Sequence, residues 1–150
     1  MRKKLNTDIY FDIANGDVSV AIRDGDFVDA SVVHCGAWFT YDTDEKDDFL
    51  EYIGLTWDEV LEIASIEDAE RDGDMVNIRF INGKVKTIPM QGWKEALEQS
   101  KLTKAQKWVL YRKIGFRVWQ RNQDKSFKMF GRYPHQLSAE ETAEWQRECL

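Results

Sequence analysis

The sequence DIYFDIANGDVSVAIRDGDFV, residues 8–28, contains the pattern that decides the fold of the N-terminal part of the chain. Apolar side chains alternate with other residues over positions 9–13 and again over positions 18–22, as expected for strands with one buried face. The Asn15-Gly16 pair between them is the preferred sequence of a type I′ hairpin turn, because both residues tolerate positive φ. This stretch therefore predicts a β-hairpin.

Two further features extend the hairpin into a meander. Asp24-Gly25 is a second turn pair of similar chemistry, and the residues after it are rich in valine and aromatic side chains. A third strand is predicted over residues 27–41, with a bulge or bend at Gly36. The first forty-one residues are therefore expected to form an antiparallel β-meander.

The middle of the chain combines helical patterns with one clear hairpin. A helix is predicted over residues 44–53, a second after the capping box that begins at Thr56, and a short third over residues 92–100. Residues 75–90 alternate on both sides of a central Asn-Gly pair, which predicts a hairpin whose second strand lies at a sheet edge, because it ends near a proline.

The segment after residue 100 is open to two interpretations. A capping box at Thr103 predicts a helix over residues 104–114, and Gly115 is typical of the residue just beyond a helix end. Residues 116–130 are then predicted to form a third hairpin with a four-residue loop. The alternative is that the helix continues through Gly115 to Arg121.

The fold class follows from this order of elements. A last capping box at Ser138 opens a final helix, and no repeat, linker or low-complexity tract marks a domain boundary. A length of 150 residues is close to that of one domain. We predict a single α+β domain over residues 1–150, with an antiparallel N-terminal β-meander, further β-hairpins and packed helices.

Composition favours a folded protein of a reducing compartment. Hydrophobic residues make up 43% of the chain and aromatic residues 13%, which excludes intrinsic disorder. No run approaches the roughly 18 apolar residues of a membrane span, and the basic start at residues 2–4 lacks the apolar stretch of a secretory signal. Cys35 and Cys149 lack CxxC spacing and favour free thiols over a disulfide. We expect a soluble, cytoplasmic protein without a membrane partner.

Charge is segregated along the chain, although the net charge is only −6. Residues 42–74 contain fourteen acidic and two basic side chains, and the patterns above predict that this acidic stretch is mainly helical. Residues 101–133 contain ten basic side chains and one acidic. Separated charge of this kind is the strongest indication of function in the sequence.

The first functional hypothesis is a non-enzymatic binding protein that uses the acidic stretch. Closely spaced carboxylates on helices can imitate the phosphates of a duplex, which carries about one charge per 1.7 Å. Such a face would bind a basic or nucleic-acid-binding protein partner, as an antagonist, an inhibitor or an immunity-type accessory factor. The alternative is a solvated face that pairs with the basic segment, within the chain or across a homodimer. The predicted face comprises Asp42, Asp44, Glu45, Asp47, Asp48, Glu51, Asp58, Glu59 and Glu62.

The second hypothesis is a nucleic-acid-binding accessory protein that uses the basic, aromatic segment 101–133. Cationic grooves with aromatic stacking platforms bind single strands. In the predicted hairpin Arg117, Trp119 and Arg121 share one strand face, and Lys128 and Arg132 complete the set. The cations of the preceding helix do not line up, which favours core aromatics and solvated or internally paired cations instead.

The third hypothesis is an enzyme that uses His34 and distant carboxylates for acid–base chemistry. His34 and Cys35 are adjacent, so on a strand they point to opposite faces and cannot form a nucleophile–base pair. The run over residues 42–48 lacks the residues that an EF-hand loop needs at its fifth and sixth positions. Nucleotide, hydrolase and zinc motifs are absent from the sequence, so we predict no metal or cofactor and prefer binding over catalysis.

Overall fold

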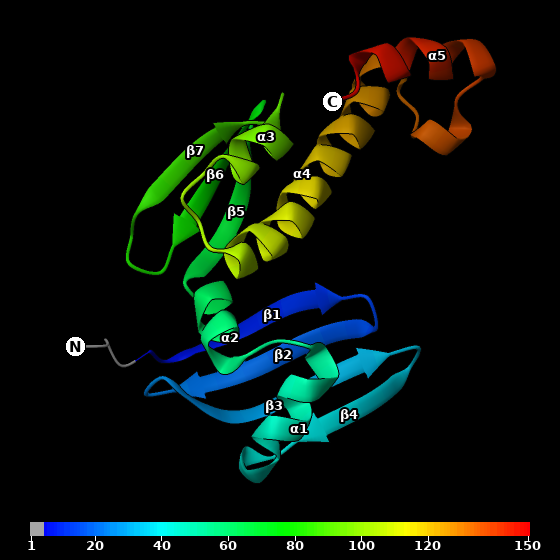
Figure 1. The fold of residues 1–150 in the computed structure, drawn as a ribbon. Coiled ribbons are helices and arrows are strands. Elements are labelled where there is room, and N and C mark those ends of the chain that lie inside the picture. The colour runs from blue at the N-terminus through cyan, green and yellow to red at the C-terminus, as the bar shows by residue number, and fades with distance from the viewer. Residues whose placement is uncertain (1–4) are drawn as a thin grey trace. The chain divides into compact units, whose positions relative to one another are not determined.

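A computed structural model describes residues 5–150, so the basic start at residues 2–4 lies outside the described part of the chain. The chain forms two compact units. Unit 1 comprises the residues up to Ser65 together with Thr103–Val109, and unit 2 comprises Ile66–Leu102 and Leu110–Leu150. Figure 1 shows the elements of both units. The long helix α4 (Lys104–Phe130) supplies residues to each.

Unit 1 is built on a four-stranded antiparallel sheet with the order β1-β2-β3-β4. Its strands are β1 (Thr7–Ile13), β2 (Gly16–Arg23), β3 (Asp26–His34) and β4 (Ala37–Tyr41) (Figure 1). The predicted meander is confirmed, but it contains one strand more than expected. The stretch 27–41 is not one bent strand, because the chain reverses at Cys35-Gly36.

Two turns of the meander have positive φ values, and only one of them was predicted from the sequence. Asp24 and Gly25 have φ values of 54° and 79°, so the predicted tight turn is confirmed. Cys35 and Gly36 form a second turn with both φ values positive, 49° and 80°. Cysteine is rare in this region of φ/ψ space, which is why the sequence pattern did not reveal the reversal.

The first turn lies one residue earlier than predicted. Ala14 and Asn15 connect β1 to β2, and Gly16 already pairs with Ile13 in the ladder. Gly16 has a φ of 136°, and a Cβ built there would lie 2.4 Å from the Val33 carbonyl oxygen. Glycine is therefore required at this position for close approach of the backbones rather than for a type I′ turn.

One face of this sheet is buried by helices of unit 1. These are the short 3₁₀ turn η1 (Thr43–Glu45) and the helices α1 (Lys46–Ile53) and α2 (Trp57–Ala64). Phe49 of α1 is fully buried, with its ring 5.6 Å from Phe27 and 5.4 Å from Tyr41. The alternating apolar residues of the strands form the rest of this core: Ile9, Phe11, Val18, Val20, Ile22, Ala30 and Val32.

Unit 2 contains a three-stranded antiparallel sheet, β5 (Ile66–Asp72), β6 (Met75–Phe80) and β7 (Val85–Pro89). Its other elements are α3 (Trp93–Glu98), the rest of α4, η2 (Pro134–Gln136) and α5 (Ala139–Glu148). The hairpin over residues 75–90, the edge position of Pro89 and the short helix after it are confirmed. Strand β5 corrects the prediction of a mainly helical acidic stretch, because the C-terminal part of this stretch forms a strand.

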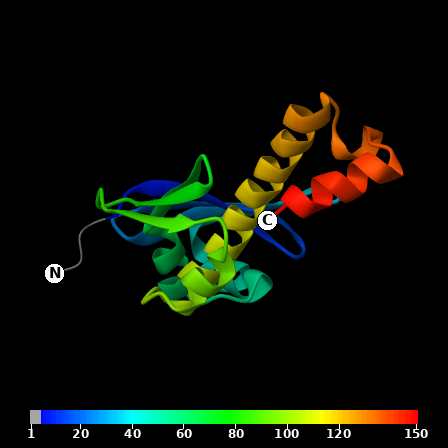
Figure 2. The same ribbon diagram turned by 90° about the horizontal axis from the view of Figure 1, so that it is seen from above.

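Helix α4 corrects the larger part of the C-terminal prediction. It runs without interruption to Phe130, so the hairpin predicted over residues 116–130 is wrong, and the alternative of a continued helix is right and extends further. Gly115 lies inside the helix, where the Trp93 side chain packs over it, and Gly131, with a φ of 67°, follows the true end. Figure 2 shows that α5 then returns toward α4 within unit 2.

Candidate functional site

The nine carboxylate residues predicted to form a binding surface, from Asp42 to Glu62, are referred to below as the acidic face. All nine belong to unit 1 and lie on η1, α1 and α2 or at the ends of these elements. Six of the side chains are exposed and the other three, Glu45, Glu59 and Glu62, are half-buried. The structure thus places the predicted residues on consecutive short helices.

Most charges of the acidic face are not neutralised within the described chain. Asp44, Asp47 and Asp48 form no ion pair with any residue of 5–150. Lys46 is the one basic residue between positions 42 and 65, and its Nζ lies 4.7 Å from the centre of the Trp57 ring. The face therefore keeps a concentrated negative charge.

Two members of the acidic face also have a structural role. The Glu59 carboxylate accepts the Thr56 backbone N–H at 3.0 Å, and Thr56 Oγ1 accepts the Glu59 N–H at 3.2 Å. This confirms the predicted capping box of α2. Glu45 accepts the Asp42 N–H at 3.0 Å in the same way at the start of η1. These bonds fix where the helices begin and so hold the neighbouring carboxylates in place.

The charges of the acidic face affect the pKa of Tyr41, the last residue of β4. The pKa of its hydroxyl is raised, first because burial disfavours the phenolate and then because Tyr52, Asp48 and Glu45 are close by. One carboxylate oxygen from each of Asp42, Asp44 and Glu45 lies within 4.8 Å of the others. Negative charge is therefore concentrated where β4 leads into η1.

The strand part of the acidic stretch behaves differently, because arginines of unit 2 pair with four of its five carboxylates, those of Glu67, Asp68, Glu70 and Asp74. Asp74 accepts a hydrogen bond from Arg121 Nε at 3.1 Å, and an Asp68 oxygen lies 3.7 Å from Arg117 Nη2. Arg79 of β6 pairs with Glu70 of β5. The acidic stretch is thus divided into two parts. In the helical part, Asp44, Asp47 and Asp48 form no ion pair within the described residues, whereas in the strand part most carboxylates pair with arginines of the sheet or of α4.

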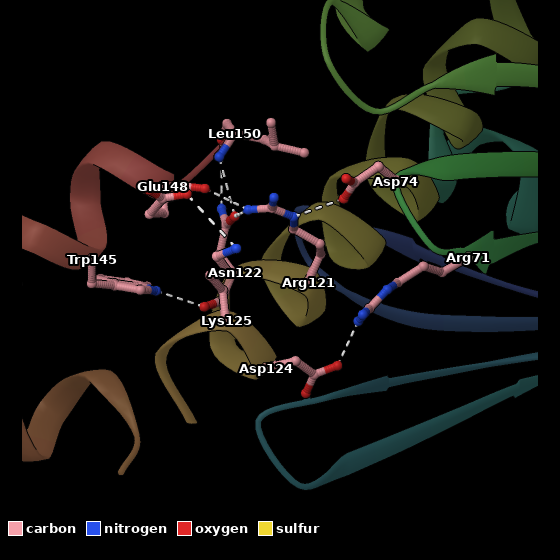
Figure 3. Close-up of polar contacts among 9 residues, drawn as sticks. All are labelled: Arg71, Asp74, Arg121, Asn122, Asp124, Lys125, Trp145, Glu148 and Leu150. Atoms are coloured by element: carbon pink, nitrogen blue, oxygen red, sulfur yellow. Dashed lines mark hydrogen bonds and ion pairs between the residues drawn. The ribbon is translucent and has the colours of Figure 1, made fainter. Parts of the chain in front are cut away.

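Arg121 is the centre of a polar network that fastens the C-terminus to α4 (Figure 3). Its side chain is only 12% exposed, and Nη1 donates to the Glu148 carbonyl oxygen at 2.5 Å. In the next position, Asn122 Oδ1 accepts the Leu150 N–H at 3.1 Å, and the Asn122 carbonyl accepts Trp145 Nε1–H at 2.7 Å (Figure 3). This part of the basic segment therefore serves the internal structure of unit 2.

The other residues predicted for nucleic-acid binding do not form one surface. Because residues 117–121 are helical, Arg117 and Trp119 point about 160° apart around α4, so the predicted shared strand face is wrong. Arg117 Nε donates to the Ala69 carbonyl oxygen at 2.8 Å, and Arg132 pairs with Glu141. Three of the five predicted residues, Arg117, Arg121 and Arg132, are thus occupied within unit 2.

The two remaining members of that set are on the surface. Trp119 is 56% exposed and stacks on Phe116 with ring centroids 5.8 Å apart. Lys128 is exposed and forms no ion pair with a described residue. A stacked pair of rings and one free cation lack the convergent cations that a nucleic-acid groove requires.

His34 and Cys35, considered above for catalysis, are closer than predicted. Cys35 lies in the turn and not in a strand, and its Sγ is 3.6 Å from His34 Nε2, so the expectation of opposite faces is wrong. Over residues 5–150, however, His34 forms no hydrogen bond or ion pair with a carboxylate. The acid–base pair that the enzyme hypothesis requires is not formed in this part of the chain.

Sequence reasoning missed a further exposed feature, the outer strand β4. Trp38 is 68% exposed and Phe39 is 48% exposed, although both were assigned to the interior of a longer strand. The signal that could have found it is the run Ala37–Tyr41, which contains no charged residue and directly follows a glycine. This strand lies next to the acidic face in sequence.

Comparisons of the chain with known protein families, with curated proteins and with solved structures find no match. Within residues 5–150, none of the helices combines the length and the apolar character needed to cross a membrane. The functional argument therefore depends on the geometry and charge of the surfaces described above.

Proposed function

We propose that this protein is a non-enzymatic binding protein whose acidic face captures a basic or nucleic-acid-binding protein and thereby inhibits or neutralises it. The observation that supports this proposal is that the exposed residues Asp44, Asp47 and Asp48 form no ion pair among residues 5–150, whereas acidic residues of β5 pair with arginines. The same chain thus uses one group of carboxylates for its own structure and leaves the other for solvent or a partner.

The charge of unit 1 supports the same conclusion. Its described residues include fifteen Asp and Glu side chains and only four Lys and Arg side chains. Excess charge of one sign destabilises a compact structure by self-repulsion, and it also raises the rate at which an oppositely charged partner is captured. A basic partner would relieve this repulsion, so the charge that is unfavourable for folding favours binding.

The helices of the acidic face are anchored to the sheet or capped, and pre-organised helices reduce the entropy lost on binding. Phe49 anchors α1 to the sheet, and the capping box at Thr56 fixes the start of α2. Short helices with fixed ends present carboxylates in a constant arrangement, as mimicry of a phosphate array requires.

The experiment is capture of partners from the native host with immobilised protein, with and without nuclease treatment and at low and moderate salt. The test variant carries Asp44→Lys, Asp47→Lys and Asp48→Lys. The control variant carries Glu95→Lys, Glu140→Lys and Glu144→Lys, three exposed residues of unit 2 without ion pairs among residues 5–150. Both triple variants change the net charge equally, and all replaced residues except Glu144 lie in the first turn of a helix.

The proposal expects one dominant basic protein to be captured by the wild type and the control variant and lost with the test variant. Its binding should weaken by tenfold or more when salt is raised from about 50 to 300 mM, because exposed charges are then screened. Equal capture by both variants, or capture that disappears on nuclease treatment, would refute the proposal.

A further inference from the structure

Strand β4 differs from the other strands at sheet edges in lacking any protection against strand addition. The two sheets have four edge strands, β1, β4, β5 and β7, and over residues 5–150 only β4 has neither a charged residue nor a proline. Its register with β3, from Ala37 to Tyr41, contains no bulge. Proteins normally guard edges with charges, prolines or bulges, because an open edge offers unpaired N–H and C=O groups to another strand.

The opposite edge of the same sheet, strand β1, is protected against strand addition by charged residues. Strand β1 carries Asp8 and Asp12, which alternate with its buried residues, and Asp8 pairs with Arg23 of β2. β4 has Trp38 and Phe39 in place of charges, and both are exposed. An unguarded edge with exposed aromatic rings favours an extended segment as its occupant.

The two faces of β4 would meet different side chains of an added strand. Phe39 and Tyr41 are opposite the buried residues of β3, so they lie on the side covered by the helices, whereas Trp38 is opposite Val33 on the other side. Alternate residues of an added strand would therefore approach the helical side, where η1 and α1 carry their carboxylates, and the remaining residues would approach Trp38.

The negative charge near β4 indicates which kind of strand can pair with its edge. Asp42 follows the last residue of β4 directly, and Asp48 and Glu45 are close enough to raise the pKa of Tyr41. A second copy of this chain paired at β4 would bring the same carboxylates and would be repelled. An extended segment with Lys or Arg at alternate positions meets them with opposite charge.

We propose that the partner adds an extended basic segment to the sheet at β4, with its backbone paired to β4 and its cationic side chains on η1 and α1. This inference rests on the proposed function, because it states how the partner of the acidic face is held. Backbone pairing provides affinity, and the alternation of cationic with apolar residues provides selectivity.

The test uses two synthetic peptides of equal charge on the full-length protein. The first alternates lysine and valine over nine residues. The second has the same sequence with N-methyl groups on its three central residues, which remove N–H donors from both edges of the peptide strand. We measure affinity by calorimetry at low salt and hydrogen exchange of the Trp38–Tyr41 amides by NMR.

We expect the first peptide to bind at least tenfold more tightly than the N-methylated one and to protect amides of β4 from exchange. Asp44→Asn with Asp47→Asn and Asp48→Asn should weaken binding of both peptides, whereas Glu140→Gln with Glu144→Gln should weaken neither. Equal affinities without protection of β4 would overturn strand addition and leave the proposed function standing.

Two other results would also be decisive. If neither peptide binds, the inference and the proposed function both fail. If amides of β4 become protected as the concentration of free protein rises, the edge is occupied by a second copy, and the basic segment is the wrong occupant.

Discussion

Replacing Gly115 by alanine tests the continuity of α4, because the sign of the effect depends on the backbone at this position. Inside a helix, alanine is more favourable than glycine by about 0.8–1.0 kcal/mol. The Cβ added at Gly115 would lie 3.8 Å from Trp93 Cη2, which is an ordinary van der Waals contact, so no clash offsets this gain. We expect the free energy of unfolding to increase by roughly 0.5–1 kcal/mol.

The assay is urea unfolding followed by far-ultraviolet circular dichroism, together with thermal unfolding, where about 1 kcal/mol corresponds to roughly 2–4 °C in a chain of this size. Gly54→Ala is the matched control. Gly54 follows α1 with a φ of 72°, and a Cβ there would meet no atom within 4 Å, so neither site has a clash and the sign of the effect depends on the backbone conformation. Alanine there should destabilise by about 1 kcal/mol. If Gly115→Ala destabilises to a similar extent, residue 115 is a helix end and the continuous helix is wrong.

Two further predictions concern helix ends. Thr56→Ala removes the side-chain cap of α2 and should lower the free energy of unfolding by about 1 kcal/mol, whereas Thr56→Ser should retain most of it, as measured by urea unfolding. The Ser138 backbone N–H donates to Glu141 and lowers the pKa of the Glu141 carboxyl, with smaller contributions from the Ser138 hydroxyl and from Arg132. Because the folded-state pKa is the lower one, this stability is present above the ordinary glutamate pKa of about 4.3 and is lost as the pH falls through the folded value. Unfolding between pH 6 and 3 should therefore depend less on pH in Glu141→Gln, and an unchanged pH dependence would contradict the assignment.

Helix starts were predictable because the residues that form them are close in sequence. The three predicted capping boxes, beginning at Thr56, Thr103 and Ser138, are all present, with reciprocal bonds of 2.9–3.2 Å. Each box involves a residue and the third one after it, so no distant part of the chain is needed to form it. The burial of alternate residues in β1 and β2 was predictable for the same reason.

The C-terminal prediction failed where distant residues overrule local preference. Gly115 is a typical helix terminator, but Ile114 and Val118 are buried on either side of it and Trp93 packs over it. Burial of this helical stripe outweighs the roughly 1 kcal/mol that glycine costs in a helix. The failed hairpin also misplaced Arg117 relative to Trp119, because a strand and a helix orient residues two positions apart in different ways.

The candidate site also has one part that could be predicted from local sequence and one part that was missed. The helices of the acidic face followed from hydrophobic spacing and capping, and the structure confirms α1 and α2, whereas the start of the helix predicted over residues 44–53 is the 3₁₀ turn η1. The exposed edge β4 was missed, because the turn that separates its strand from β3 places Cys35, a residue rarely found at positive φ, beside Gly36.

The sequence by itself determined the local features of this protein: the meander, the helix starts, and a stretch with far more carboxylates than cations. Only the tertiary structure decided which of those carboxylates are neutralised. Asp68 and Asp74 are next to arginines of α4, whereas Asp44, Asp47 and Asp48 form no ion pair over residues 5–150. The reason is physical: ion pairing depends on distances of a few ångströms between residues some fifty positions apart, and these distances exist only after the chain has folded.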